Sequence, residues 1–222
     1  GLKNAVQKAL PKGKTFADIT SLTIENASGA SLYWSDDRQG KFADPLTEND
    51  AFTFLLDDCY NLKALDLSKA AMKASKVASY EYQGGTTQAP NGSTTTTYNS
   101  PTDGTWFPAE ALYRERTRRL DGGINTGMKI MPTLKSLELP ENTTVIGMKS
   151  CRMLSALENI KIPKSVTEIS NMAFENTDDG TAAATIEFEA GSALKTLGNR
   201  AFMRLGTGSL KLPDSVESIG SN

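Results

Sequence analysis

A repeated phrase of apolar residues constrains this chain more than any other feature. Residues 134–140 read L-x-x-L-x-L-P, and residues 157–163 read L-x-x-I-x-I-P, 23 positions later. The phrase returns in part at residues 186–188 (IEF) and 210–213 (LKLP). In repeats of this length each unit buries its apolar side only by stacking on its neighbours. The repeat therefore predicts an elongated solenoid that presents a surface.

Within each unit, alternating apolar and polar residues predict a short strand. Leu137 and Leu139 alternate with Ser136 and Glu138, which places the leucines inward and the polar side chains outward. Pro140 follows directly, and because proline lacks an N–H it ends the hydrogen-bond ladder. Strands of successive units are expected to pair in parallel.

The second halves of the units also align. Residues 166–174 (VTEISNMAF) match residues 194–202 (LKTLGNRAF), and residues 215–220 begin a third copy. The apolar spacing suits a turn or short helix lying on the strand layer. Small residues such as Ala173 would allow adjacent coils to approach, with Phe174 filling the space between them.

In these residues the chain resembles the BspA-type leucine-rich repeats, whose unit runs roughly L-x-x-I-x-I-P-x-S-V-x-x-I-G-x-x-A-F-x-x-C. Residues 157–174 are the closest copy, clear copies cover about 134–220, and degenerate ones reach back to residues 62–67. The resemblance implies an α/β fold, namely a leucine-rich-repeat solenoid. It would be a right-handed β/α-type coil with a parallel sheet of short strands, an irregular N-terminal cap and one inserted loop.

Three parts of the chain are expected. Residues 1–50 form an N-terminal cap with a first degenerate repeat, including a helix at 2–10 that Pro11 and Gly13 stop and a strand around Leu22. Residues 51–133 hold degenerate repeats with an inserted Thr-rich loop or mobile hairpin (84–104) and a helix (108–120). Residues 134–222 are the regular repeats.

The predicted helix at 108–120 carries four arginines. One interpretation is a basic patch that binds an anionic glycan or a phosphate. Glu110 and Glu115 lie close enough on a helix to pair with the arginines, which favours the other interpretation, an ordinary solvent-exposed helix face. Residues 108–112 also look like a degenerate copy of the turn that carries the Ala-Phe pair of the clear repeats, residues 173–174 and 201–202. The arginines are Arg114, Arg116, Arg118 and Arg119.

Aromatic residues of the irregular N-terminal half form one candidate binding surface. Exposed Tyr and Trp anchor many protein and sugar interfaces, although packing beneath a cap or long loop is the commoner role. The candidates are Tyr33, Trp34, Tyr80, Tyr82, Tyr98 and Trp106, with Tyr113 in the same set.

The outward position between the two inward apolar residues of each strand forms a second candidate surface, a concave stripe. Over the last four units its charge alternates in sign, so each side chain would have an opposite charge one strand away. We expect the stripe to neutralise itself largely and not to suit a highly charged ligand. Its members are Asp66, Glu138, Lys161, Glu187 and Lys211.

The two cysteines, Cys59 and Cys151, both fall at interior positions of the repeat. A buried thiol behaves as a small hydrophobe, and two thiols several units apart along a solenoid lack the geometry for a bridge. Free core thiols are therefore predicted.

The composition argues against catalysis and against several classes of partner. The chain has no histidine, which removes the usual general base and the commonest metal ligand, and no cofactor or metal site is expected. Its adjacent acidic pairs lie near turn residues, and residues 178–180 (DDG) read as a loop tip. A net charge of −2 and the lack of a long apolar run predict neither nucleic-acid binding nor membrane insertion.

The resemblance implies an exported or surface-anchored bacterial protein with an adhesion or interaction role toward a host or neighbouring-cell protein. A structural spacer in a longer surface protein and a polysaccharide-binding module are the alternatives. The chain ends partway through a unit and starts without an export signal. Both features fit a segment of a longer protein whose signal or anchor has been removed.

Overall fold

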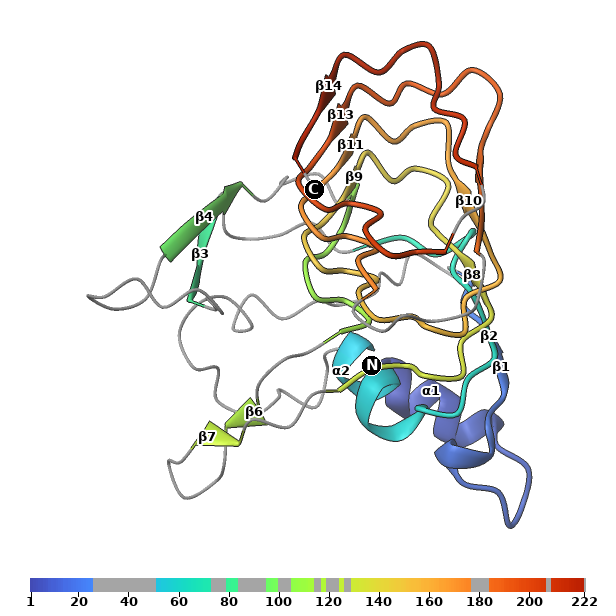
Figure 1. Cartoon of the computed structure of the whole chain (residues 1–222). Coiled ribbons are helices and arrows are strands. Elements are labelled where there is room, and N and C mark those ends of the chain that lie inside the picture. The colour runs from blue at the N-terminus through green and yellow to red at the C-terminus, as the bar shows by residue number, and fades with distance from the viewer. Residues whose placement is uncertain are drawn as a thin grey trace.

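The chain folds into a stack of coils whose short strands form two parallel sheets (Figure 1). The computed structural model describes residues 1–25, 51–72, 105–113, 129–176, 184–206 and 209–221, and the backbone alone of 79–83, 95–99, 117–118 and 124–125. Each of the four coils that begin at β2 (Ala64–Asp66), β8 (Ser136–Glu138), β10 (Asn159–Ile162) and β12 (Thr185–Phe188) contributes one strand to each sheet and then turns into the next coil. The solenoid predicted from the repeat is confirmed.

The first sheet has the strand order β1-β2-β8-β10-β12, and all its pairs are parallel. Its register sets Leu22, Leu65, Leu137, Ile160 and Ile186 side by side, as the alignment of the repeats predicts. The strands are β1 (Ser21–Thr23), β2 (Ala64–Asp66), β8 (Ser136–Glu138), β10 (Asn159–Ile162) and β12 (Thr185–Phe188).

The second sheet is formed by the return leg of each coil, with the order β14-β13-β11-β9-β5. Each return leg is a two-residue strand followed by turns, and no helix occurs in residues 129–176, 184–206 or 209–221. The strands are β5 (Trp106–Phe107), β9 (Val145–Ile146), β11 (Glu168–Ile169), β13 (Thr196–Leu197) and β14 (Ser218–Ile219).

The turn after each second-sheet strand repeats in atomic detail. The N–H groups of Leu112, Cys151 and Phe174 donate to a carbonyl of the following coil at 2.7–2.8 Å. Two positions earlier in each turn stands a residue other than glycine with φ between 53° and 57°. This left-handed backbone costs roughly 1 kcal/mol per residue, which its own N–H bond to the next coil helps to offset. The residues at this position of the turn are Glu110, Lys149, Met172 and Arg200.

Apolar rows from both sheets meet in one continuous core. Val166, Ile169, Ala173 and Phe174 of one coil are each no more than 1% exposed. The rings of Phe174 and Phe202 stack with centroids 5.4 Å apart, so this position fills the space between coils as predicted.

Two helices cover the N-terminal end of the stack (Figure 1). They are α1 (Leu2–Ala9), the helix predicted at 2–10, and α2 (Ala51–Asp58). The Phe52 ring on α2 meets the Phe107 ring on β5 edge-on at 5.6 Å, so α2 packs on the first strand of the second sheet. The Lys3 ammonium reaches the Asp58 carboxylate at 3.0 Å and ties α1 to α2.

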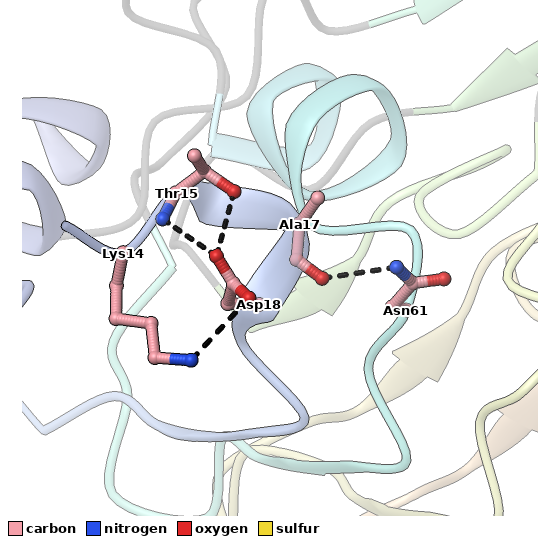
Figure 2. Close-up of polar contacts among 5 residues, drawn as sticks. All are labelled: Lys14, Thr15, Ala17, Asp18 and Asn61. Atoms are coloured by element: carbon pink, nitrogen blue, oxygen red, sulfur yellow. Dashed lines mark hydrogen bonds and ion pairs between the residues drawn. The ribbon is translucent and has the colours of Figure 1, made fainter.

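A short 3-10 helix, η1 (Phe16–Asp18), leads into β1 and is held by its own acidic residue (Figure 2). The backbone N–H and the hydroxyl of Thr15 both donate to Asp18 Oδ2, at 2.8 and 2.9 Å, and Lys14 Nζ lies 3.5 Å from Asp18 Oδ1. The Thr15 backbone bond, more than any other contact, lowers the pKa of Asp18 below its ordinary value. The Asn61 amide donates to the Ala17 carbonyl at 2.9 Å and joins the approaches to β1 and β2.

The helix predicted at 108–120 is wrong. Residues 109–112 form turns, and Thr117–Arg118 is a strand, β6, paired antiparallel with β7 (Ile124–Asn125). The physical reason is that the Leu112 N–H, which a helix would bond to the carbonyl of residue 108, donates to Ser150 of the next coil, and the Glu110 N–H likewise donates to Met148. The other interpretation, that residues 108–112 are a degenerate copy of the Ala-Phe turn of the repeats, is correct.

One insertion contains an antiparallel hairpin. Strand β3 (Ser79–Gln83) pairs with β4 (Thr95–Asn99), so residues 95–99 of the predicted loop belong to a strand. The second half of the predicted cap, the rest of the Thr-rich loop and residues 178–180 lie outside the described residues.

Candidate interaction surface

The outward side chains of the first sheet form a continuous polar surface, which we call the polar sheet face. It has two rows of five residues, and none of the ten is buried. Parallel pairing in register keeps each row straight across the five strands. The small row is Ser21, Ala64, Ser136, Asn159 and Thr185; the charged row is Thr23, Asp66, Glu138, Lys161 and Glu187.

The charged row alternates in sign only over Glu138, Lys161 and Glu187. Asp66 stands directly beside Glu138, so two like charges are neighbours, and Lys211 lies outside both sheets. With three carboxylates and one ammonium, the row is acidic. The predicted alternation is thus seen over Glu138, Lys161 and Glu187; Asp66 lay outside it from the start, and with Lys211 outside the sheet the neutralisation of the whole stripe stays a prediction.

Lys161 has a closer partner than its neighbours in the row. Its ammonium lies 2.8 Å from Glu189 Oε1, and this bond, followed by weaker attraction to Glu187 and Glu138, raises the pKa of Lys161. The same bond lowers the pKa of Glu189, as does the Lys164 N–H that donates to Glu189 at 3.0 Å. Glu189 follows the strand, and the strand repeat alone gives no signal for this pair.

The structure does not bring the aromatic candidates together as one surface. Trp106 lies on β5 and is only 7% exposed, so it packs and cannot serve as a contact residue. Tyr113 is 1% exposed. In the hairpin, Tyr80 stands opposite Tyr98 in register, while Tyr33 and Trp34 lie outside the described residues.

A partly buried polar network crosses the stack at the turns, and the sequence pattern did not predict it. Arg152 Nε donates to Glu175 Oε2 and Arg152 Nη1 donates to the Tyr113 hydroxyl, both at 2.6 Å. Arg200 from the next coil lies 3.7 Å from the other Glu175 oxygen. Tyr113, Arg152 and Glu175 each follow the aligned residues Leu112, Cys151 and Phe174 by one, so aligning the turns one position further would have found it.

Both cysteines are buried and free, as predicted. Cys59 is 0% and Cys151 1% exposed. Burial raises the pKa of each thiol to about 12, with repulsion from Asp58 adding to the effect at Cys59. Neither thiol is poised as a nucleophile, because the thiolate is the reactive form.

Two kinds of site are absent from the described part of the chain. No group of three or more Cys, Asp or Glu side chains in it has the arrangement of a metal site. None of its helices has the length and apolar character that crossing a bilayer requires.

Two parallel ladders running through stacked coils define the class, a leucine-rich solenoid. Residues 129–222 match the family model described as BspA type Leucine rich repeat region, in six copies. This part of the chain is a BspA-type leucine-rich-repeat region, as the resemblance indicated. No curated protein and no solved structure matches the chain. Strands β1, β2 and β5 precede the matched residues yet continue the same two ladders.

Proposed function

We propose that this chain is a non-enzymatic interaction module of adhesive type, and that its polar sheet face receives a protein or glycan partner. The observation that carries the proposal is that ten outward side chains on five strands, none of them buried, lie in register on one face. Proteins with BspA-type repeats are generally secreted or surface proteins of bacteria, which supports an exported location.

The chemistry of the face suits a partner rich in hydrogen-bond donors. Apart from Ala64, the small row offers hydroxyl and amide groups on short side chains, which allow a partner to approach the sheet closely. The charged row adds the carboxylates of Asp66, Glu138 and Glu187, which accept strong bonds from hydroxyl, amide or ammonium donors.

The scaffold favours recognition because it holds the face in place before binding. Every strand that carries the face lies in the first sheet, and its inward side chains are packed into the core. A preorganised surface loses little conformational entropy on association. The lack of histidine in the whole chain supports a role without acid–base catalysis.

Tyr80, Tyr82 and Tyr98 of the hairpin stay in the proposal as a second contact region, since Tyr is common at interfaces. Trp106 is left out because it is buried.

The test is an array of extracellular-matrix proteins, mucins and glycans probed with the purified chain and two matched variants. Asn159→Lys places a long charged side chain on β10, next to the central strand of the polar sheet face. Asn142→Lys makes the same change at an exposed corner away from it. We expect a saturable partner whose binding weakens about tenfold in Asn159→Lys and is unchanged in Asn142→Lys.

A blank array with all three chains folded would contradict the proposal and favour a spacer role. Equal binding by both variants would place the contact elsewhere on the molecule.

A further inference from the structure

A further row of side chains borders the polar sheet face where the strands begin. We call it the entry row, and it consists of the residue just before each of β1, β2, β8 and β10. The backbone N–H groups of Lys63, Lys135 and Glu158 donate to the entry-row carbonyl of the preceding coil at 2.8–2.9 Å, so the row is continuous across the coils. All its side chains are exposed. The members are Thr20, Lys63, Lys135 and Glu158.

Each charge of the entry row is opposite in sign to the charged-row residue three positions later on the same strand. On the neighbouring strands β2 and β8 a lysine comes first and a carboxylate second, while on β10 a carboxylate comes first and a lysine second. The two charges of a strand lie about 10 Å apart, since a strand rises about 3.3 Å per residue. The pairs are Lys63 and Asp66, Lys135 and Glu138, and Glu158 and Lys161.

This pattern makes the face complementary to itself. A two-fold axis that runs across the strands, midway between the entry row and the charged row, sets each strand against the same strand of a second copy in the opposite direction. Every facing pair on β2, β8 and β10 is then of opposite sign, and each pair occurs twice. Glu187 on β12 has no opposite charge in this arrangement, because the buried Ala184 precedes its strand.

Three charges of the two rows have no ion-pair partner within the described part of the chain. They are Lys63, Asp66 and Glu138. The Asp66 carboxylate is nevertheless fixed in direction, because its Oδ1 accepts the Ser68 N–H at 2.9 Å. Against a second copy, Lys63 meets Asp66 and Glu138 meets Lys135, so all three charges gain a partner. Complementary charges of this kind fix the register of a contact.

The small row lies between the two charge-bearing rows and allows the copies to approach each other. On the three strands with opposite charges its side chains are Ala64, Ser136 and Asn159. The face spans about 20 Å, since its five strands lie about 4.8 Å apart. An area of this size is below that of a stable dimer, so the contact is weak. Weak contacts hold two surfaces together when many of them act at once.

We propose that the polar sheet face binds a second copy of this chain, with each strand antiparallel to the same strand of the other copy, so that two surfaces carrying the chain adhere to each other. The proposal rests on the proposed function, since it names the protein that this face receives. A partner with charges of one sign would be repelled by part of the face, whereas a second copy is matched on β2, β8 and β10.

The first test uses two variants that should each associate poorly and should pair with each other. Lys63→Asp and Asp66→Lys each set like charges against one another in the dimer, while a mixed pair of the two variants restores opposite charges at both contacts. In sedimentation at low salt, we expect the unaltered chain to move toward twice its 23.9 kDa as its concentration rises. Each variant alone should associate about tenfold more weakly, and an equimolar mixture should recover the association.

Lys8→Asp and Asp214→Lys are the matched controls, because they reverse the same charges at exposed positions outside the face and the entry row. Both should associate as the unaltered chain does, and circular dichroism verifies that all four variants fold. Salt at about 0.5 M should weaken the association of the unaltered chain, since charges make the contact.

Three outcomes overturn the proposal. The first is an unaltered chain that is monomeric at every concentration. The second is a mixture of Lys63→Asp and Asp66→Lys that stays monomeric while the unaltered chain dimerises, which would place the dimer contact on another face. The third is an equal loss of association in the two control variants.

The array described above, with the chain itself added as one immobilised protein, separates this proposal from the proposed function. Binding to the immobilised chain that is weakened in Asp66→Lys supports both. Binding only to another protein or to a glycan, weakened in Asn159→Lys, supports the proposed function and overturns the second copy as its partner. No binding anywhere, the immobilised chain included, contradicts both.

Discussion

Arg152 Nε lies 2.6 Å from Glu175 Oε2, and the Glu175 side chain is only 3% exposed. The two residues come from adjacent coils, so their ion pair joins the coils where the chain turns. The pair Lys135–Glu158 has the same 2.6 Å separation and also bridges adjacent coils, yet both of its side chains are more than half exposed. The two pairs therefore separate the effect of burial from that of distance.

We predict that Glu175→Gln lowers the free energy of unfolding by about 2–3 kcal/mol, because it leaves the Arg152 charge, only 14% exposed, without its carboxylate. Glu158→Gln should cost less than about 1 kcal/mol, as exposed pairs do. Urea unfolding followed by circular dichroism measures both. Equal costs would show that burial does not set the strength of these bridges.

Gly198 is expected to be intolerant of any side chain. A Cβ at this position would lie 2.5 Å from the backbone nitrogen of Asn171 in the preceding coil, so Gly198→Ala must push two coils apart. We expect a loss of about 2–3 kcal/mol in urea unfolding.

Gly191→Ala is the control for the glycine prediction. At Gly191 the φ angle is +76° and an added Cβ meets nothing within 4 Å, so only conformational strain of about 1 kcal/mol applies. A cost at Gly198 no larger than at Gly191 would contradict the close stacking of the coils.

The free energy of unfolding should fall at acid pH, because two carboxyl groups have lowered pKa values in the folded chain. The ordinary values are 3.8 for Asp18 and 4.5 for Glu189, and both pKa values are lowered in the folded chain. The two carboxylates stabilise the folded chain fully at a pH above their ordinary pKa values. This stabilisation is lost as the pH falls through their lower pKa values in the folded chain.

The double variant Asp18→Asn/Glu189→Gln should therefore show a shallower decline in the urea midpoint below about pH 4.5. Glu141→Gln, at an exposed corner, controls for the removal of a negative charge alone. A decline as steep as that of the unaltered chain would show that neither carboxylate is linked to folding.

Both native thiols should resist modification while the chain is folded. Because burial raises the pKa of Cys59 and Cys151 to about 12, little thiolate forms at pH 8 and the reagent cannot reach it. Ellman's reagent should react with two thiols in denaturant, and in buffer only at the rate of unfolding. A fast stoichiometric reaction in buffer would mean that one of the two sites opens locally.

The solenoid was predictable because its signal is repeated. Leu137, Ile160 and Ile186 recur at aligned positions, and the register of the first sheet sets them side by side. The return leg was predictable only as a turn or short helix, because a two-residue strand has too few positions to show a period.

The helix at 108–120 was predicted wrongly because the local sequence pattern carries no information about bonds to the neighbouring coil. The N–H groups of Glu110 and Leu112 bond to that coil, and this tertiary contact overrides a helical pattern. The candidate surface was predicted in part. The outward positions were correct, but the pairing of Lys161 with Glu189 depends on a side chain beyond the strand.

Trp106 is the other candidate residue for which the structure differs from the predicted surface, because its side chain is buried. An aromatic residue in an irregular stretch has no periodic partner from which its direction can be inferred. Packing was the commoner alternative, and it is the one the structure has.

The most direct test of the interaction surface is carboxylate footprinting of the chain alone and in complex with the partner that the array identifies. We predict that labelling of Glu138 and Glu187, on the polar sheet face, falls in the complex while labelling of the exposed Glu217 on the last coil does not. Loss of labelling at Glu217 with Glu138 and Glu187 unchanged would contradict the claim that this face binds the partner.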